Sequence, residues 1–514
     1  MYKYTRSFLL VAAVVALAGC AHEASVEPAS LPVEADRTPL SRTEVTEEIE
    51  GELGRGRLFS WAERDDRFVY SAAVAEDSLV SVGYWLGDSD GWERRIGLVD
   101  TDSDAWRELR ETLIAVAWRA EREALGAAVS REDLLAGRER VPGVPQLTLR
   151  LRSPGAVAAL RAHEAVRYVE PLGFELADQG LRRRSDKGCE VSPPASLPGA
   201  DYVELAPAGK SPWNFGRHRI REAQSLAQGT GVRVQIIDTG AGEGQENLGA
   251  DFSAGAPATR DVRKVSTHYS GWWWWRALEG PDDVCGHGTQ MAGLAVGPRA
   301  GDGNAVGVAY GADLTSVRAV EDVLITSSEE SEGVRDALVL AGDDPSTRIV
   351  SMSIGSPLDN ATVRDGIYYA YNRGKLLLAA AGTSLEWLTW YGVVFPASMP
   401  EVVAVTGVQE GQPYAACATC HAGPEVDFVI EMQRRGEADR TSLSLALGGD
   451  DPVYVGGSSA ATATTAGIAA LVWSRHPGLD RAGVVDRLAR ASVYYPDRDP
   501  RFGWGGIDAY EAVR

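Results

Sequence analysis

The chain contains two arrangements of apolar and polar residues. In the first, apolar positions recur at helical spacing from 106 to 124, and Gly126 is the expected end of that helix. Shorter patterns predict strands at 79–86, 147–152 and 166–169 and a short helix at 156–162. Together these elements predict a small α+β unit over residues 55–172.

The second arrangement occupies residues 212–514. Continuous apolar runs predict buried strands, and helical patterns lie between several of them; the strands are 232–237, 314–320, 349–353, 376–380 and 402–405, and the helices are 334–340 and 363–371. Strands of this kind that alternate with helices are typical of an α/β fold with a doubly wound, mostly parallel sheet. In such a sheet, chemistry collects at the carboxyl ends of the strands.

The N-terminus has the pattern of an export signal. Residues 1–19 begin with Lys3 and Arg6, continue with an apolar run too short to cross a bilayer, and end in Leu-Ala-Gly before Cys20. This ending resembles a bacterial lipobox, which implies a lipid on Cys20 and a protein anchored in the cell envelope, at the outer membrane or in the periplasm. An ordinary signal peptide that ends in cysteine is the alternative.

Two polar segments flank the first unit. Residues 20–54 are rich in Glu, Pro, Ser and Thr without an apolar period, which predicts a flexible tether. Residues 173–211 are expected to form a linker. Within it, the run Arg182-Arg183-Arg184 is either a solvated stretch or a processing site.

The length and the net charge of the chain limit the number of domains and the classes of partner that we expect. The 514 residues accommodate two or three domains with at least one large core. The formal net charge of −21 makes nucleic acid an unexpected partner, because so acidic a surface repels it. The same repulsion opposes binding to an anionic membrane surface, so that membrane attachment would depend on the lipid at Cys20.

Four cysteines remain when Cys20 is set aside, an even number that suits an oxidising compartment. They are Cys189, Cys285, Cys417 and Cys420, and three disulfide pairings are open. Residues 417–421 also spell Cys-Ala-Thr-Cys-His, the attachment pattern of c-type haem, so a haem-bearing electron carrier is one alternative function. Since no second haem ligand is evident nearby, no cofactor is expected.

A hydroxyl group stands at the start of a bare helical pattern in residues 455–471, Val-Gly-Gly-Ser-Ser-Ala-Ala-Thr-Ala-Thr-Thr-Ala-Gly-Ile-Ala-Ala-Leu. One interpretation makes Ser458 the N-cap of this helix. The other makes Ser459 a nucleophile at the positive end of the helix, where free N–H groups stabilise an oxyanion. The stretch alone favours the cap.

Two further segments change that balance. Asp238 ends the apolar run Val-Arg-Val-Gln-Ile-Ile-Asp-Thr-Gly, at the expected tip of a strand, and His287 lies between glycines in Cys-Gly-His-Gly-Thr. Taken alone, an aspartate at a strand tip or a histidine between glycines more often has a structural role than a catalytic one. In chain order, however, Asp238, His287 and Ser459 supply a carboxylate, an imidazole and a hydroxyl.

The three segments together resemble the subtilisin-like serine proteases (subtilases, peptidase family S8). The family signatures are Asp-Thr-Gly or Asp-Ser-Gly, Gly-His-Gly-Thr and Gly-Thr-Ser-Met-Ala-x-Pro. Further matches follow in the family's order from about residue 212 to the C-terminus; they lie at 307–314, 351–355, 378–382, 395–405 and 502–508. The resemblance implies an extracytoplasmic serine endopeptidase that acts on proteins or peptides.

The resemblance also implies roles for individual residues. Ser459 would attack the scissile carbonyl, His287 would take and return the proton, and Asp238 would orient the imidazole. Three residues, Ser353, Ile354 and Gly355, would pair with the substrate backbone as an added strand.

Departures from the family pattern affect the oxyanion hole and the serine motif. Thr383 stands where the family has an oxyanion-hole Asn, and its shorter side chain has one donor. Loss of this donor costs on the order of a hundred- to a thousandfold in turnover in a protease of this family. The serine motif has Ser458, Ala460 and Ala463 in place of Thr, Met and Pro. A catalytically silent, peptide-binding relative is therefore the second alternative.

Two other features lie outside the family pattern. Asn247 stands where many relatives have a calcium-ligating Asp, so no metal ligand is assigned. The segment between Asp238 and His287 is longer than usual and contains Trp272 to Trp275. This run is expected to be an insertion packed on the catalytic domain, or else an exposed aromatic lip beside the cleft.

The first α+β unit gains a meaning from the same family. Residues 147–171 resemble the inhibitory propeptide of subtilases, which implies that the chain's own N-terminal unit is a partner whose tail occupies the cleft until it is cut. Cutting in the linker would leave the lipid on the propeptide and release the protease, unless the two parts stay bound.

Overall fold

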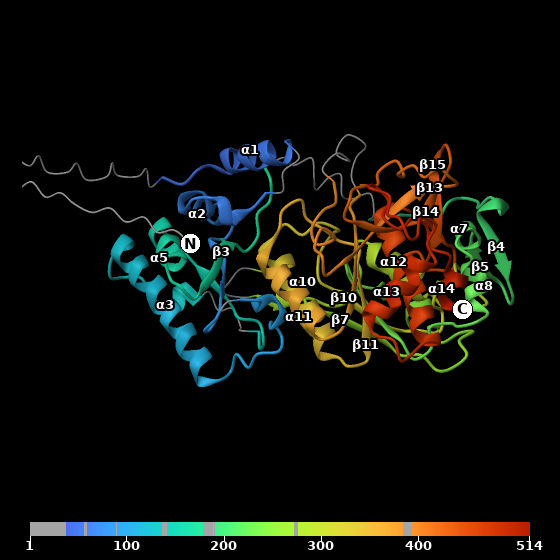
Figure 1. Ribbon diagram of the computed structural model, residues 1–514, viewed down its shortest axis with the longest axis horizontal. Helices are drawn as coiled ribbons and strands as arrows, with labels where there is room; N and C mark the ends of the chain where they lie inside the picture. The colour runs from blue at the N-terminus through green and yellow to red at the C-terminus, as the bar shows by residue number, and fades with distance from the viewer. Residues whose placement is uncertain are drawn as a thin grey trace, which may run out of the picture. The chain divides into compact units, whose positions relative to one another are not determined.

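The computed structural model describes residues 38–55, 59–88, 90–135, 141–177, 189, 191–271, 276–383 and 392–514 (Figure 1). Several sequence features lie outside the described residues: the export signal at 1–19, the lipidation site at Cys20, the arginines at 182–184 and the tryptophans at 272–275. In the part of the chain that is described, no helix has the length and apolar character needed to cross a bilayer.

The N-terminal unit is built on a three-stranded antiparallel sheet in the order β2-β1-β3. The strands are β1 (Leu79–Tyr84), β2 (Gln146–Arg150) and β3 (Val166–Pro171). The helices are α1 (Arg42–Leu53), α2 (Asp66–Ala75), α3 (Asp104–Leu125), α4 (Arg131–Leu135) and α5 (Pro154–Arg161). The three predicted strands and both predicted helices are confirmed, and α3 ends at Gly126 as expected.

The tether predicted at 20–54 is not flexible over its last part, because α1 forms there. Ser41 caps the helix and Glu44 returns a side-chain bond to the cap, which completes a capping box. Val45, Ile49 and Leu53 follow at four-residue intervals and are buried in the core of the N-terminal unit. This apolar spacing inside an acidic stretch is the period that the sequence analysis missed.

The predicted linker at 173–211 also contains structure. Its end forms a hairpin of β4 (Tyr202–Leu205) and β5 (Gly209–Pro212). A disulfide joins Cys189 to Cys285, two residues before His287. This part of the linker is therefore fastened to the α/β unit.

The α/β unit is organised around a nine-stranded sheet in the order β16-β15-β14-β13-β12-β11-β6-β10-β7. Neighbouring strands run parallel along the part of this order from β14 through β13, β12, β11, β6 and β10 to β7. The strands β15 and β16 extend the β14 edge in antiparallel fashion. Their bounds are β6 (Arg233–Asp238), β7 (Val262–Ser266), β10 (Asp313–Arg318), β11 (Thr347–Met352), β12 (Leu376–Ala380), β13 (Val403–Gln409), β14 (Val426–Arg434), β15 (Glu437–Ser444) and β16 (Val453–Val455). The predicted α/β fold with a mostly parallel sheet is confirmed.

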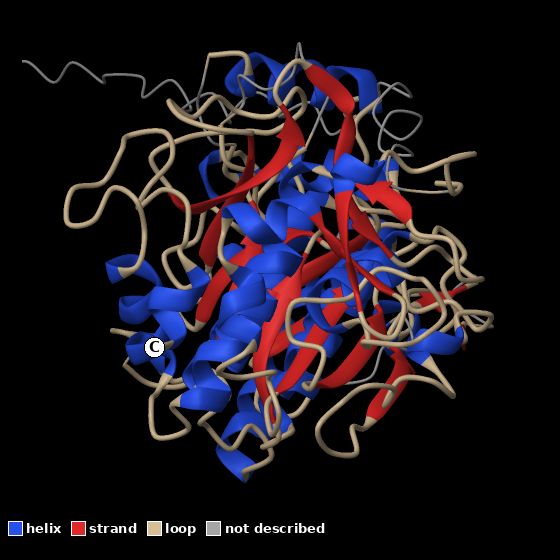
Figure 2. Cartoon of the chain, turned by 90° about the vertical axis from the view of Figure 1, so that its right-hand side faces the viewer, coloured by secondary structure: helices blue, strands red, loops and turns tan. Residues whose placement is uncertain are grey.

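Helices cover both faces of this sheet, and Figure 2 shows the strands between them. Ile236 packs with α9 and α12 in one core, whereas its neighbour Ile237 packs with α10 and α11 in another. The helices of this unit are α7 (Trp213–Arg217), α8 (Ile220–Gln224), α9 (His287–Val296), α10 (Ser328–Asp343), α11 (Ala361–Asn372), α12 (Gly457–Arg475), α13 (Arg481–Arg490) and α14 (Ala509–Val513). Double coverage explains why the central strands are apolar on both sides.

The three-stranded sheet of the N-terminal unit contacts α11 through buried polar groups. Arg167 forms a bidentate ion pair with Asp365, at 2.7 Å and 3.1 Å, and Tyr168 donates to the same carboxylate at 2.8 Å. Glu170 accepts from the N–H of Ala361, the first residue of α11, at 3.1 Å. These contacts join the N-terminal unit to the α/β unit.

Candidate active site

Asp238 is the last residue of β6, at the point where the strand order reverses. The chain leaves β6 for the sheet edge at β7, returns to β10 on one side of β6, and continues to β11 on the other side. Ligands of doubly wound sheets bind at such a point, outside the carboxyl ends of the strands. Asp238 is completely buried there.

The structure brings Asp238 and His287 together. Nδ1 of His287 and Oδ1 of Asp238 are 2.7 Å apart, and both side chains are buried. His287 is the first residue of α9, whose start lies against the loop after β6. A side chain at Gly288 would meet the carbonyl oxygen of Gly240 at 2.3 Å, so only glycine permits this approach.

The electrostatics of the pair favour a protonatable imidazole. Burial lowers the pKa of His287, but the charge and the hydrogen bond of Asp238 outweigh it, so the net shift is upward from the ordinary value of 6.5. Asp283 and Asp322 add to this upward shift.

Asp283 is a functional neighbour that the sequence analysis missed. Its buried carboxylate accepts from the N–H groups of Gly286 and Thr289, at 2.7 Å and 2.8 Å, and from the Thr289 hydroxyl at 2.6 Å. These bonds satisfy N–H groups at the start of α9 and place a negative charge at its positive end. An acidic residue three positions before the Gly-His-Gly motif is the signal that points to it.

Ser459 is the third residue of α12, so its N–H has no acceptor within the helix. It makes two reciprocal bonds with Ser353 at the end of β11: the Ser459 hydroxyl donates to the Ser353 carbonyl at 3.3 Å, and the Ser353 hydroxyl donates to the Ser459 carbonyl at 3.0 Å. Among the described residues, no hydrogen bond joins Ser459 to His287. The structure thus pairs Asp238 with His287 directly, and Ser459 with Ser353.

Ser458 is not the N-cap of α12, so the interpretation that the isolated stretch favours does not apply. The cap position is Gly456, and the Gly457 that follows has a positive φ of 77°. The Ser458 side chain is turned inward instead, where its Oγ accepts from the N–H of Gly382 at 3.2 Å and lies 2.7 Å from Oγ1 of Thr383.

Thr383 therefore lies next to the first turn of α12, as an oxyanion donor would have to. Its hydroxyl oxygen already has two contacts with Ser458. Its Oγ1 accepts from the N–H of Ser458 at 3.0 Å. Ser458 is fully buried, its Oγ accepts from Gly382, and either hydroxyl can be the donor in its contact with Thr383. In one of the two arrangements Ser458 is the donor to Thr383 Oγ1. Thr383 then accepts twice, and its own O–H remains available on an exposed residue.

The predicted substrate-binding residues differ in their surroundings. Ser353 lies beside Ser459, as described above, and Ile354 is buried. The backbone of Gly355 is already paired: its N–H donates to Val323 at 3.0 Å and its carbonyl accepts from Ile325 at 2.9 Å. The loop after β10 thus occupies the backbone pairing groups of Gly355.

The expected tail of the N-terminal unit does not follow residues 353–355 in its described part. After β3, the N–H of Glu175 donates to Glu76 at 2.8 Å, and the N–H of Ala177 donates to Thr46 of α1 at 2.9 Å. The segment returns to its own unit because the end of α2 and α1 provide its partners. Residues 178–188 lie outside the described residues.

The Cys-Ala-Thr-Cys-His segment is a disulfide loop. Cys417 is bonded to Cys420, which uses both thiols that haem attachment would need. His421 Nδ1 lies 2.7 Å from the carbonyl oxygen of Gly392, and a backbone bridge joins Thr383 to Cys420. The disulfide loop is therefore paired with the segment after β12 that contains Thr383.

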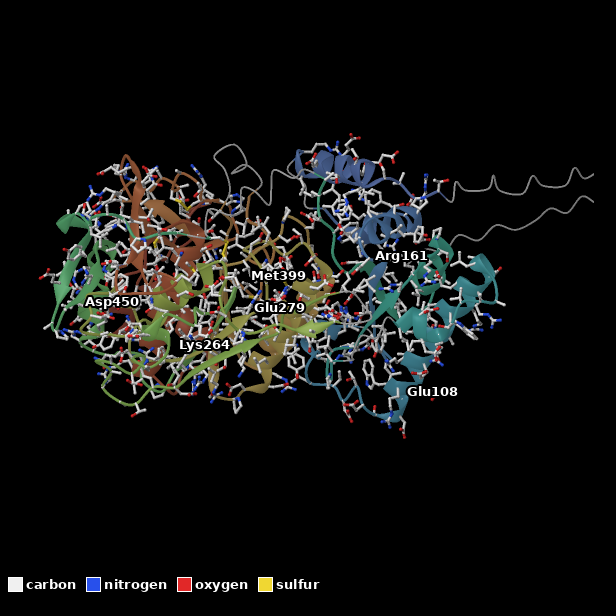
Figure 3. The ribbon with its side chains drawn as sticks, turned by 180° about the vertical axis from the view of Figure 1, so that it is seen from behind. Glu108, Arg161, Lys264, Glu279, Met399 and Asp450 are labelled. Atoms are coloured by element: carbon white, nitrogen blue, oxygen red, sulfur yellow. A yellow bond between two sulfur atoms is a disulfide. The ribbon has the colours of Figure 1, made fainter. Side chains whose placement is uncertain are left out.

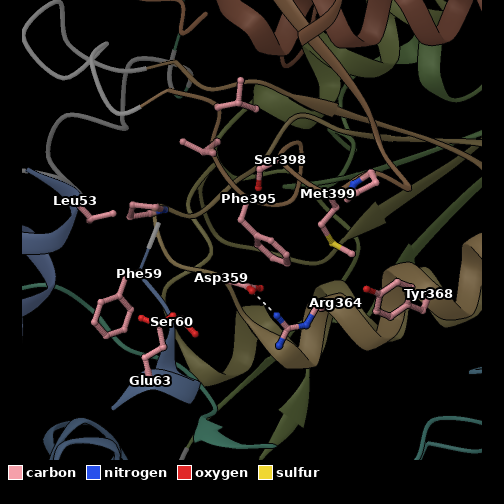
Figure 4. Close-up of a pocket in the computed structure, with 14 residues that line it drawn as sticks. Leu53, Phe59, Ser60, Glu63, Asp359, Arg364, Tyr368, Phe395, Ser398 and Met399 are labelled. Carbon is pink, nitrogen blue, oxygen red and sulfur yellow. Dashed lines mark hydrogen bonds and ion pairs between the residues drawn. The ribbon is translucent and has the colours of Figure 1, made fainter. Parts of the chain in front are cut away.

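Asn247 is buried, and its amide donates to the Asp302 carboxylate at 2.6 Å. A cavity of about 450 Å³ lies between the N-terminal unit and the segment after β12 (Figure 4), and two of its lining residues, Val394 and Phe395, lie against Gly355. Its lining includes Phe59, Phe395 and the ion pair of Asp359 with Arg364.

Comparison with known proteins shows what the chain is similar to. The model of the subtilase family matches residues 229–505. A subtilisin from Bacillus sp. (strain TA39) is 26% identical over 317 residues, which cover 58% of this chain and 70% of that protein. The M-protease of Shouchella clausii (strain KSM-K16) is 24% identical over 414 residues, which cover 78% of this chain and 96% of the protease.

Among solved structures, MycP1 from the ESX-1 type VII secretion system is similar, with a TM-score of 0.48 and 23% sequence identity. The similarity covers 64% of this chain and 92% of the MycP1 chain.

Proposed function

The chain belongs to the subtilase family of serine endopeptidases, and we propose that Asp238, His287 and Ser459 form its catalytic triad. The observation that carries this proposal is the 2.7 Å contact between Asp238 and His287, both buried at the switch point of the sheet. Ser459 attacks the scissile carbonyl, His287 takes its proton and returns it to the leaving amine, and Asp238 stabilises the imidazolium.

The hydroxyl of Ser459 must turn toward His287 before it can attack. Its bond to Ser353 is long for a hydroxyl donor, at 3.3 Å, so rotation about the Cα–Cβ bond gives up little. Catalytic hydrogen bonds are often loose before substrate binds and tighten in the complex.

Thr383 and the N–H of Ser459 are the proposed oxyanion donors. The N–H lies in the first turn of α12, and the Ser458 N–H donates to Thr383 Oγ1. We propose that the Ser458 hydroxyl is also the donor in its contact with Thr383, which leaves the Thr383 O–H to donate to the oxyanion. A threonine can thereby take the place of the Asn that the family usually has, with Ser458 as its positioning residue.

Substrates are proteins or peptides, held as an added strand along Ser353, Ile354 and Gly355. Because Gly355 is paired with Val323 and Ile325, a substrate strand has to displace the loop after β10. Substrate binding therefore includes a loop movement.

The location that the similarities support is extracytoplasmic, since the relatives include a subtilisin and an M-protease and the chain forms two disulfides. We propose further that Cys20 carries a lipid and that residues 55–172 act as the chain's own propeptide. The ion pair of Arg167 with Asp365 supports the second point, because it fixes this unit on the helices of the α/β unit.

The triad is tested by labelling the purified full-length chain with a fluorophosphonate, which reacts with activated serines. The wild type is expected to be labelled and the Ser459→Ala variant is expected to be inert. Ser225→Ala is the matched control, since it removes the hydroxyl of an exposed serine outside the site and should leave labelling unchanged. Failure of the wild type to react, with the fold intact by circular dichroism, would favour the silent peptide-binding alternative.

The anchor and the zymogen are tested in cells by blotting membrane and soluble fractions for the C-terminal part. A Cys20→Ala variant is expected to move the full-length chain out of the membrane fraction. A Ser459→Ala variant is expected to remain unprocessed. If the blot of wild-type cells detects only the full-length chain, and only in the membrane fraction, release by processing is contradicted.

A further inference from the structure

A histidine and two glutamates converge at the base of the hairpin that interrupts the segment between Asp238 and His287. The hairpin consists of β8 (Tyr269–Ser270) and β9 (Ala277–Leu278). His268 precedes it and Glu279 follows it, while Glu321 comes from the loop after β10. One ligand atom from each of the three residues lies within 4.8 Å of the others. Figure 3 labels Glu279 on the yellow-green part of the ribbon.

The His268 ring is the feature that sets this cluster apart from a surface group of acids. Its side chain is only 3% exposed, yet neither ring nitrogen has a hydrogen-bond partner within the described part of the chain. The nearest carboxylate oxygen, on Glu321, is 3.6 Å from Nε2, which is too long for a hydrogen bond. A buried imidazole with two unsatisfied nitrogens is costly unless something binds it.

From this convergence we propose that His268, Glu279 and Glu321 bind a divalent transition metal ion of the zinc type. One imidazole nitrogen with two carboxylate oxygens suits zinc, cobalt or manganese, whereas calcium and magnesium prefer oxygen ligands alone. Three protein ligands leave a further coordination position for water. The site is distinct from the position of Asn247, where the family pattern places a calcium ligand.

Arg318 orients one of the three ligands. Its guanidinium forms an ion pair with Glu279 at 2.5 Å and donates to the carbonyls of Gly280 and Asp282, at 3.4 Å and 3.2 Å. The backbone adds a second constraint, because the N–H of Glu279 donates to the carbonyl of His268 at 3.0 Å. Ligands fixed by such outer partners need little rearrangement to bind an ion.

The metal ion would connect the hairpin base to the loop after β10. Glu321 is two residues from Val323, whose carbonyl accepts from Gly355. Binding would therefore hold the base of the hairpin next to the loop after β10, which pairs with the predicted substrate-binding residue Gly355. The site itself does not depend on catalysis, so it can be tested in an inactive chain.

The test uses the full-length Ser459→Ala chain, which cannot digest itself, titrated with Co²⁺ in the absorption spectrometer and with Zn²⁺ in the calorimeter. One equivalent of each ion is expected to bind, and Zn²⁺ is expected to raise the melting temperature by mass action. His268→Gln and Glu321→Gln should each weaken binding by at least about tenfold, because loss of even an outer partner has an effect of this size.

His163→Gln and Glu164→Gln, which change a histidine and a carboxylate of the N-terminal unit, are matched controls and should leave affinity unchanged. Glu321 is 59% exposed, so its substitution leaves the core intact and keeps the test valid where His268→Gln fails to fold. The proposal is overturned by the absence of stoichiometric binding, by Ca²⁺ binding in preference to Zn²⁺, or by binding that survives Glu321→Gln, as it would for an ion held at His287.

Discussion

The hydroxyl oxygens of Thr383 and Ser458 lie 2.7 Å apart, although 75 positions separate the two residues in the sequence. The contact crosses from the end of β12 to the first turn of α12. When Ser458 is the donor in this contact, as proposed above, the Thr383 proton is available to a substrate.

Removal of the Thr383 hydroxyl should lower kcat with little change in KM. Thr383→Val keeps the shape of the side chain and is expected to reduce kcat by on the order of a hundred- to a thousandfold, as for other oxyanion donors. Steady-state kinetics on a peptide substrate measure the effect. Equal changes in kcat and KM would contradict the assignment.

Ser458→Ala should also lower kcat, but by less, because Thr383 keeps its hydroxyl and loses only the neighbour that directs it. The double variant with Thr383→Val should be no slower than Thr383→Val alone, since the two residues act as one unit. Independent, additive losses would show that Ser458 acts elsewhere.

Activity should rise with pH through a value above 6.5. His287 must be neutral to act as a base, and Asp238 outweighs burial to raise its pKa. Asp238→Asn removes the source of the upward shift and should reduce kcat by on the order of 10⁴. A pH profile of kcat/KM on wild type and variant measures both effects.

Asp365→Ala should destabilise the chain by about 3–5 kcal/mol, because it leaves the Arg167 guanidinium buried without its counter-charge. Asp486→Ala on α13 removes an exposed pair with Arg490 and should cost less than about 1 kcal/mol. Denaturant unfolding of both variants in the Ser459→Ala chain makes the comparison. Similar losses would show that Arg167 is not buried in solution.

Glu170 should make the contact with α11 weaker as pH rises. Burial raises the pKa of this carboxyl from 4.5 to about 7, against the lowering effect of Arg364 and with the repulsion of Asp359 and Asp365. Since the pKa is raised in the folded state, its contribution is complete below 4.5 and is lost as pH approaches 7. Glu170→Gln should lose this dependence, which thermal unfolding between about pH 4 and 8 would show.

Apart from β14, which was not predicted, the inner strands of the sheet were predictable because they are continuous apolar runs between helical patterns. The edge strands were not. β15 begins with the exposed polar residues of Glu437–Ser444, and β7 mixes charged and apolar positions, so neither has a clear period. Their place depends on partners in the sheet that a local pattern does not contain.

The candidate site was predictable in its residue types but not in its contacts. Motifs identify Asp238, His287 and Thr383 by position in the chain. The roles of Asp283 and Ser458 arise from side chains turned toward distant segments. The N-cap interpretation of Ser458 does not apply for the same reason, because its hydroxyl contacts Thr383 in the segment after β12.

Because of the disulfide bond between Cys189 and Cys285, the position of a backbone cut determines whether the two pieces stay covalently joined. A chain opened on the C-terminal side of Cys189 and before Cys285 would remain one covalent molecule, so the lipid proposed for Cys20 would still anchor the enzyme. A chain opened before Cys189 would leave only noncovalent contacts between the pieces. With the lipid proposed for Cys20, the position of the backbone cut relative to Cys189 would decide whether the enzyme stays at the membrane or is released.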